Sequence, residues 1–243
     1  MNENLNLSLS VPFSSIIITI LAIVFVVDLI LAWRTWISNR KHPANIYFAL
    51  TILMVSFWTL TIMLGERVFN DPFLISVFIR GCYFFATLLI FFFYIFTHYF
   101  PYKTSKLSLI SFVFLLLSTI FIVFISIWPN ILIAGRVLPQ NRFNPEISLF
   151  WHLVFALYFL TMVVLSYYNL FVKYKKSGGI WRQRLRQVII ATSVATVGGS
   201  IFSLLIPIIH SEILDWLGPI FTLFMAAYIW YYIFWLPSRV DKN

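Results

Sequence analysis

Arg80 is the residue whose surroundings most suggest chemistry, because it lies inside a long apolar stretch, DPFLISVFIRGCYFFATLLIFFFYIF. An arginine in the middle of a membrane helix costs about 2.5–3.5 kcal/mol on insertion scales, so it normally faces protein or water and binds a partner. Acidic and aromatic residues of other segments reach a similar depth: Glu66, Glu212, Asp215 and His152. Arg80 therefore forms an ion pair that joins helices, extends to the membrane surface, or belongs to a ligand site.

The ligand-site hypothesis gives the aromatic neighbours of Arg80 a role. Trp58 and Tyr83 would form the walls of a pocket on the outer side, and Arg80 would anchor a small, anionic ligand. Under this hypothesis six residues contribute to the site: Arg80, Glu66, Trp58, Tyr83, His152 and Asp215.

Asp28 is a second charge within an apolar segment, near the opposite membrane surface. His98, Asn45 and Tyr94 lie at a compatible depth. One interpretation is a hydrogen-bonded or protonated carboxyl group that holds three helices together. The alternative is a proton switch that involves Asp28 and His98, since a buried carboxyl group can change its charge near neutral pH.

Small residues recur at every fourth position of one segment, Ala191, Ala195, Gly199 and Ser203. This spacing predicts a smooth helix face that a neighbouring backbone can approach closely. Gly198, Pro207 and the pair Gly218-Pro219 are expected to loosen the last two segments. The face serves tight packing alone, or it lets these two segments move and transmit a signal.

Motifs for catalysis are missing from the sequence. It contains no GxGxxG, Walker A, HExxH, CxxC or GxSxG pattern. The four histidines fall in different segments, and Cys82 is the single cysteine. We therefore expect a protein that is not an enzyme and that has no metal site and no cofactor.

The elements that position these residues are expected to cross a membrane. Of the 243 residues, 61% are hydrophobic and only 10% are charged, far from the composition of soluble domains. About 20 apolar residues span a bilayer as a helix, and seven runs reach that length. They cover residues 11–33, 44–64, 73–100, 107–128, 147–172, 188–209 and 213–236. The sequence thus predicts an all-α membrane protein, a seven-helix bundle that forms a single domain over residues 1–243.

Charge predicts the orientation of the bundle. The chain has 17 lysines and arginines, and apart from Arg80 only Arg67, Arg136 and Arg142 fall on the side of the N-terminus. Because basic loops stay in the cytoplasm, the N-terminus is expected outside and the C-terminus inside, in a multi-pass protein of the plasma membrane. The basic face suits the anionic lipids of the bilayer. A nucleic acid is not an expected partner.

Several stretches resemble a known family. One is NIYFALTILMVSFWTLTIML, with Asn45, Phe48 and Trp58, and the next is RGCYFFATLLIFFFYIFTHYFP, which contains Arg80 and Tyr83. The segments WRQRLRQVIIATSVATVGGSIFSLLIP and LGPIFTLFMAAYIWYYIFWL continue the pattern. Together they resemble the N-terminal seven-helix sensor region of bacterial and archaeal histidine kinases. The resemblance implies a region that detects a signal and passes it to a cytoplasmic output domain.

Two functions fit these observations. The first is a sensory or receptor module, in which an unknown small ligand or the membrane state displaces helices. No histidine follows His210, so the phosphoacceptor has no candidate there, and the output is expected from a further domain or a partner protein. The alternative is a small-solute transporter or channel-like protein. Transporters place polar residues at the membrane midplane, whereas these segments are mostly Phe, Leu and Ile, which favours the sensor. A homodimer is compatible with the sequence.

Overall fold

The computed structural model of the chain is all-helical in the part that it describes, which confirms the predicted fold class at this level. It describes residues 3–102, 109–133, 137–139, 146–202 and 214–235, with only the backbone for residues 3–14, 66 and 67. The α-helices are α1 (Glu3–Ser38), α2 (Pro43–Met63), α3 (Pro72–Tyr99), α4 (Leu109–Ile127), α5 (Leu149–Lys176), α6 (Gly179–Ser200) and α8 (Leu217–Ile229). Two π-helical turns, η1 (Leu64–Val68) and η5 (Trp230–Trp235), extend α2 and α8.

Six of the described helices are long and apolar enough to cross a membrane: α1, α2, α3, α4, α5 and α8 with η5. The chain is therefore a multi-pass membrane protein. Helix α6 corresponds to the predicted segment 188–209 but begins at Gly179, nine residues earlier. Most of the intervening residues IWRQRLRQ favour helix formation. The helix therefore includes them and begins before the apolar run does. The predicted end of that segment lies outside the described residues.

The last predicted segment, 213–236, also differs from the observed helix. Helix α8 begins at Leu217, so Gly218 and Pro219 fall in its first turn. Proline is tolerated there because the first-turn N–H groups have no partner within the helix. Leu214 precedes α8 outside any α-helix. The Gly-Pro pair thus places the start of the last helix.

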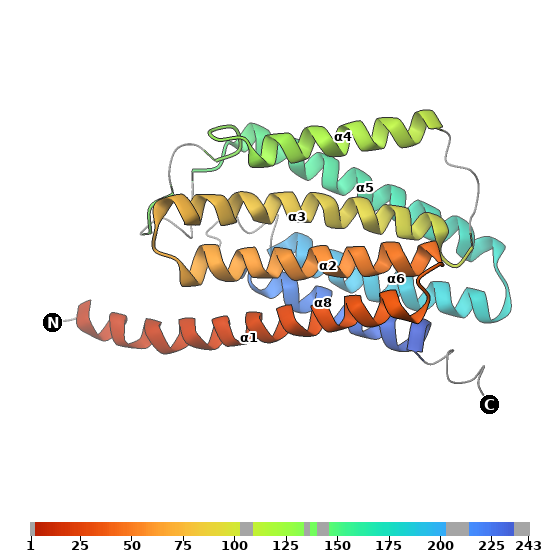
Figure 1. The fold of residues 1–243 in the computed structure, drawn as a ribbon, viewed down its shortest axis with the longest axis horizontal. Coiled ribbons are helices and arrows are strands. Elements are labelled where there is room, and N and C mark those ends of the chain that lie inside the picture. Colours follow the sequence, from red (N-terminus) through yellow and green to blue (C-terminus); the bar gives the residue numbers. More distant parts are fainter. Residues whose placement is uncertain (1–2, 103–108, 134–136, 140–145, 203–213, 236–243) are drawn as a thin grey trace.

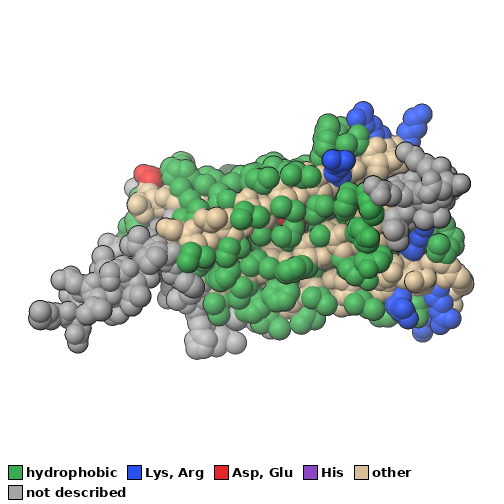
Figure 2. Space-filling view, turned by 90° about the horizontal axis from the view of Figure 1, so that it is seen from below, with side chains coloured by type: hydrophobic (Ala, Val, Ile, Leu, Met, Phe, Trp, Pro, Cys, Tyr) green, Lys and Arg blue, Asp and Glu red, His purple; other side chains and the backbone are tan. Residues whose placement is uncertain are grey.

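The helices form one bundle in which α2 is central (Figure 1). Helix α2 packs between α1 and α3, and α5, α6 and α8 complete a ring that returns to α1. Helix α4 lies outside this ring, against α3 and α5. The buried face of α1 repeats at intervals of three or four residues, at positions 17, 21, 24, 28, 31 and 35. Its other face is apolar and exposed, and Figure 2 shows such side chains along the whole body of the molecule.

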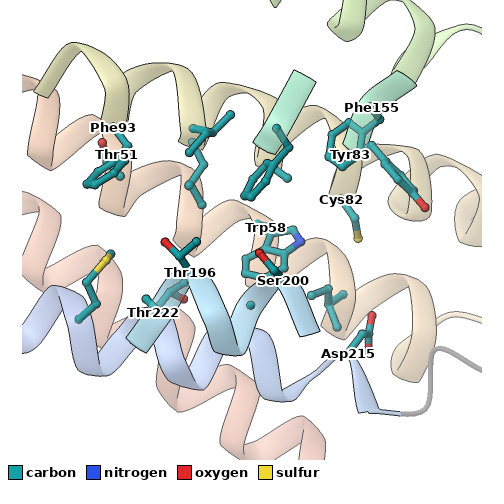
Figure 3. Close-up of a pocket in the computed structure, with 18 of the residues that line it drawn as sticks. Thr51, Trp58, Cys82, Tyr83, Phe93, Phe155, Thr196, Ser200, Asp215 and Thr222 are labelled. Carbon is teal, nitrogen blue, oxygen red and sulfur yellow. The ribbon is translucent and has the colours of Figure 1, made fainter. Parts of the chain in front are cut away.

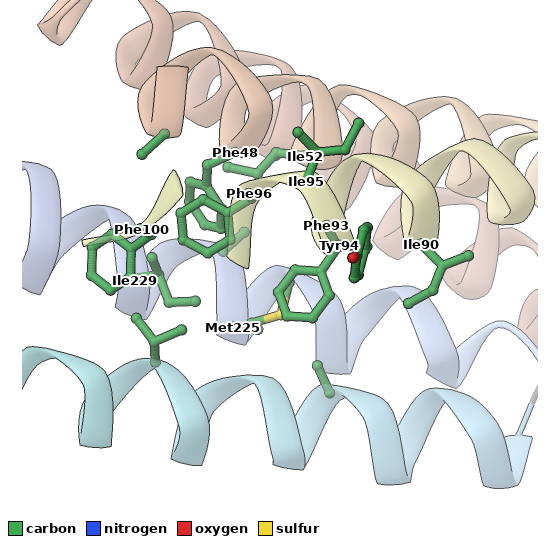
Figure 4. Close-up of a cluster of buried hydrophobic side chains, with 14 of the residues drawn as sticks. Phe48, Ile52, Ile90, Phe93, Tyr94, Ile95, Phe96, Phe100, Met225 and Ile229 are labelled. Carbon is green, nitrogen blue, oxygen red and sulfur yellow. The ribbon is translucent and has the colours of Figure 1, made fainter. Parts of the chain in front are cut away.

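The largest cluster of buried side chains lies between α2, α3 and α8 (Figure 4). Phe48 of α2 stacks near Phe96 of α3, with ring centroids 5.0 Å apart, and Phe96 continues to Phe100 at 5.2 Å. Met225 and Ile229 of α8 close the cluster from the other side. Because lipid is as apolar as these side chains, close packing rather than escape from water holds the helices together.

One buried cation connects α5 to the end of α3. Lys173 is 0% exposed, and its Nζ donates hydrogen bonds to the carbonyl oxygens of Thr97, His98, Phe100 and Tyr102 at 2.7–2.8 Å. The last carbonyls of a helix have no partner within the helix and carry a partial negative charge. The sequence interpretation counted Lys173 with the basic residues at the membrane surface. The structure buries it instead, since these carbonyls replace its water.

We expect the variant Lys173→Met to destabilise the fold. The change leaves three buried carbonyls without this donor, at a cost of about 1–3 kcal/mol each when unsatisfied, and a fourth, that of Tyr102, which is only partly buried. Lys175→Met, at an exposed position two residues away, is the matched control and should stay within about 0.5 kcal/mol of the wild type. Thermal unfolding of the purified protein in detergent measures both variants. Equal melting temperatures for the two would contradict the assigned role of Lys173.

Candidate functional site

A cavity lies at the centre of the bundle, between α2, α3, α5, α6 and α8 (Figure 3). Its volume is about 120 Å³. An apolar cavity of about 150 Å³ can bind benzene, so this slightly smaller cavity is close to the size that holds a single ring. The lining residues come from helices both early and late in the chain: Thr51, Trp58, Ile62, Ile79, Cys82, Tyr83, Ala86, Leu89, Ile90, Phe93, Phe155, Phe159, Thr192, Ala195, Thr196, Gly199, Ser200, Asp215, Thr222 and Met225.

Aromatic side chains form one wall of this cavity. Trp58 comes from α2, Tyr83 from α3 and Phe155 from α5. The rings of Tyr83 and Phe155 meet edge to face, with centroids 5.0 Å apart. The hydroxyl of Tyr83 lies 3.1 Å from Nδ1 of His152, a buried residue of α5. This hydrogen bond and the ring contact fix the orientation of Tyr83.

Hydroxyl groups form a second, polar part of the wall. Thr51, Thr192 and Thr222 donate to backbone carbonyls of their own helices at 2.8 Å. The hydroxyl of Tyr167 lies 3.2 Å from Oγ1 of Thr192 and 3.3 Å from Oγ1 of Thr196. Ser200 differs, because its Oγ is buried and has no hydrogen-bond partner within the described part of the chain. A ligand with a polar group can therefore satisfy Ser200.

One carboxyl group is among the described residues that line the cavity. Asp215, which is 8% exposed, lines one end (Figure 3), and no lysine or arginine is among the described lining residues. A carboxyl group accepts hydrogen bonds, and in its ionised form it repels anions and attracts cations. The cavity therefore suits a neutral or positively charged ligand.

Arg80 does not line the cavity, in contrast to the predicted anchor of an anionic ligand. It is partly exposed, and its Nε is buried without a hydrogen-bond partner among the described residues. The reason is helical geometry. Ile79, Tyr83 and Ile90 face the cavity, and each step along a helix turns by about 100°, so Arg80 points about that far to the side of Ile79.

The structure thus brings together three of the six predicted site residues, Trp58, Tyr83 and Asp215. His152 lies behind them and contacts Tyr83. Glu66 belongs to η1, but its side chain lies outside the described part of the structure.

The sequence interpretation missed the hydroxyl row of α6. Thr192, Thr196 and Ser200 recur at every fourth position and all line the cavity. This row lies beside the predicted row of Ala191, Ala195, Gly199 and Ser203, one residue further along. The sequence pattern that could have revealed this row is the pair of adjacent rows, one of small residues and one of residues with hydroxyl groups, which indicates a helix beside a partly polar cavity.

Asp28 lies on the buried face of α1 and is 0% exposed. Neither carboxyl oxygen has a hydrogen-bond partner among the described residues. Asn45, one predicted partner, instead donates to Ser38 at 2.7 Å and to the Thr35 carbonyl at 3.4 Å. The backbone carbonyl of His98 accepts from Lys173. The proton switch of Asp28 and His98 stays a prediction.

The close approach between α6 and α8 occurs at Gly198, one residue away from the predicted packing row. A Cβ atom at Gly198 would lie 2.5–2.8 Å from ring atoms of Phe221 in α8. A Cβ atom at Gly199 would meet no atom of the described residues within 4 Å, since this residue faces the cavity. Of the predicted row, Ala195 is buried and Ala191 is partly buried. Ser203 lies outside the described residues.

Gly198→Ala and Gly199→Ala make a matched pair of variants. Both gain about 1 kcal/mol of helix propensity, but only Gly198→Ala forces α6 away from Phe221, which costs about 1–3 kcal/mol. We expect Gly198→Ala to have the lower melting temperature of the two in detergent. A Gly198→Ala variant as stable as Gly199→Ala would show that the two helices do not meet at this residue.

Among the described residues, the site offers apolar side chains, hydroxyl groups and one carboxyl group. No group of three or more His, Cys, Asp or Glu residues lies close enough there to hold a metal ion. No protein-family model matches the chain, and comparisons with curated proteins and with solved structures found no significant match. The function is therefore argued from the cavity itself.

Proposed function

We propose that the chain is a membrane-embedded receptor module that binds a small ligand in the central cavity. This proposal rests on the observation that several different helices form the wall of the cavity. Helices α2 and α3 supply one side, and α6 and α8 supply the other. A ligand that touches both sides binds one packing of these helices better than another, and that difference shifts the population of conformations.

The ligand has an apolar, ring-sized body and a neutral or cationic polar group. Trp58, Tyr83 and Phe155 accept the apolar body, and aromatic faces also attract cations. Asp215 and Ser200 receive the polar group at their end of the cavity. This ligand class replaces the anionic ligand that Arg80 suggested from the sequence.

Helix α8 carries the response out of the membrane. It lines the cavity through Thr222 and Met225 and continues as η5 to Trp235. The ring of Phe221 in α8 packs directly against Gly198 of α6, without space for even a Cβ atom between them. A shift of α6 toward α8 therefore displaces α8. A cytoplasmic output domain or partner protein would receive this displacement, as in the sensor regions of histidine kinases that the sequence resembles.

The proposed topology has seven spans: the six helices named above as long and apolar enough to cross the membrane, and α6 in addition. The apolar part of α6, from Gln187 to Ser200, extends about 21 Å, and the rest of the predicted segment 188–209 lies outside the described residues. Helix α1 begins at one end of the bundle and η5 ends at the other (Figure 1). Lysines and arginines gather at the end that contains η5 (Figure 2). We therefore propose a plasma-membrane protein whose N-terminus is outside and whose basic end is cytoplasmic.

Epitope tags at the two termini test this topology. In intact cells we expect an antibody to reach the N-terminal tag, because that end faces outward, and to reach the C-terminal tag only after permeabilisation. A tag inserted between Ser177 and Gly178, which join α5 to α6 at the basic end, should behave as the C-terminal tag does. Two termini accessible from the same side would contradict seven spans.

Binding of benzylamine, which is cationic at neutral pH, and of benzoate tests the ligand site. We expect the purified protein to bind benzylamine more tightly than benzoate, because Asp215 repels the carboxylate. Gly199→Phe fills the cavity and should weaken benzylamine binding about tenfold or more, the effect of losing about 1.4 kcal/mol. Val197→Phe is the matched control, since Val197 lies on the exposed face of α6. Isothermal titration calorimetry measures all of these affinities.

Two outcomes would contradict the receptor proposal. Tighter binding of benzoate, or equal binding by the wild type and Gly199→Phe, would show that the cavity is not the site. Uptake of radiolabelled benzylamine by proteoliposomes, beyond that of empty liposomes and lost in Gly199→Phe, would instead favour the transporter. Binding without uptake is the result expected of a receptor.

A further inference from the structure

The junction of α5 and α6 forms a groove that the central cavity does not include. Ser177 and Gly178 alone separate the two helices, and Gly179 begins α6 with a φ of 55°. The groove has a volume of about 380 Å³. Its lining residues are Tyr174, Gly179, Arg182, Gln183 and Arg186.

The side chains of this groove are suited to phosphate. Arg182 and Arg186 are four residues apart on α6, so they project from the same face of the helix. Each guanidinium group can donate two parallel hydrogen bonds to phosphate oxygens, and Gln183 adds an amide donor. The guanidinium of Arg182 lies 5.0 Å from the ring centroid of Tyr174, a cation–π contact that holds it in place.

No described acidic residue compensates these charges. Asp71, Glu146 and Asp215 precede α3, α5 and α8, at the end of the bundle opposite the groove (Figure 1), and Asp28 is buried on α1. The surroundings of the groove add further positive charge, because Lys175, Lys176 and Arg184 lie next to its lining residues in the chain. The groove is therefore a concentrated positive site that an anion would neutralise.

Exposed apolar side chains near the groove indicate which kind of anion it would bind. Ile180 is 60% exposed and Trp181 is 43% exposed, and the guanidinium of Arg184 lies 4.9 Å from the ring centroid of Trp181. Exposed tryptophan beside arginine at the end of a membrane helix is typical of the lipid–water interface. A phospholipid matches this arrangement, with its phosphate at the arginines, Trp181 at the headgroup level, and its acyl chains along the exposed apolar residues deeper on the same face of α6, Ile190 and Val194.

We propose that this groove is a binding site for the phosphate of an anionic phospholipid. Basic pockets between membrane helices bind such headgroups. The proposal does not depend on the ligand of the central cavity, since the two sites share no lining residue.

The test uses the full chain, purified in detergent, and dioctanoyl-phosphatidylglycerol as the probe, with dioctanoyl-phosphatidylcholine as the zwitterionic comparison. We expect phosphatidylglycerol to raise the melting temperature and phosphatidylcholine to have little effect. The double variant R182Q/R186Q should bind phosphatidylglycerol about tenfold or more weakly, since each basic residue near anionic lipid contributes about 1 kcal/mol. The matched control is R34Q/R40Q, which removes the same charge at the same end but outside the groove.

Each alternative outcome decides against the proposal. Equal loss in R182Q/R186Q and R34Q/R40Q would mean attraction to the basic end in general. Equal stabilisation by both lipids would remove the role of charge. Inorganic phosphate at the same concentration that gives the same stabilisation would identify a site for free phosphate. Should R182Q/R186Q not fold, R182K/R186K keeps the charge but loses the bidentate geometry, and an unchanged affinity for phosphatidylglycerol would overturn the proposal.

Discussion

The hydrogen bonds between the Lys173 ammonium group and four backbone carbonyls are the constraint on which the arrangement of the bundle depends. They join α5 to the end of α3 without any carboxylate. Carbonyl groups do not titrate, so this junction lacks the acid sensitivity of an ordinary ion pair. Helices α3 and α5 also carry Tyr83, Phe155 and His152, so the junction joins the same two helices that supply part of the aromatic wall of the cavity.

The helical class and the membrane setting followed from the sequence because they depend on composition and on run length, which are local properties. The predicted segment 73–100 lies close to α3, since Asp71 accepts hydrogen bonds from the first N–H groups of that helix and Pro72 follows it. The start of α6 could not be placed by hydrophobicity, because helices continue beyond the membrane. The burial of Lys173 depends on the end of another helix, 71–76 residues away, which no local pattern reveals.

The candidate site was predictable in part. Aromatic and polar residues at one depth pointed to Trp58, Tyr83 and Asp215, which meet at the cavity. The rotation of each helix about its axis was not available from the sequence, and this rotation turns Arg80 aside and brings Tyr83 inward. The same uncertainty moved the close contact of α6 from Gly199 to Gly198. An error of one residue on a helix exchanges a packing surface for a binding surface.

Substitution of Gly199 would change the shape of the cavity without a clash of its Cβ atom with the described residues. Its missing side chain faces empty space, whereas its neighbour Gly198 faces a ring. A mutation to alanine, serine or valine at position 199 adds one to three heavy atoms on the side of the cavity, and the first of them, Cβ, meets no described atom within 4 Å. The wall of the cavity can thus be altered at one position of α6, whereas the same substitution one position earlier would meet the ring of Phe221.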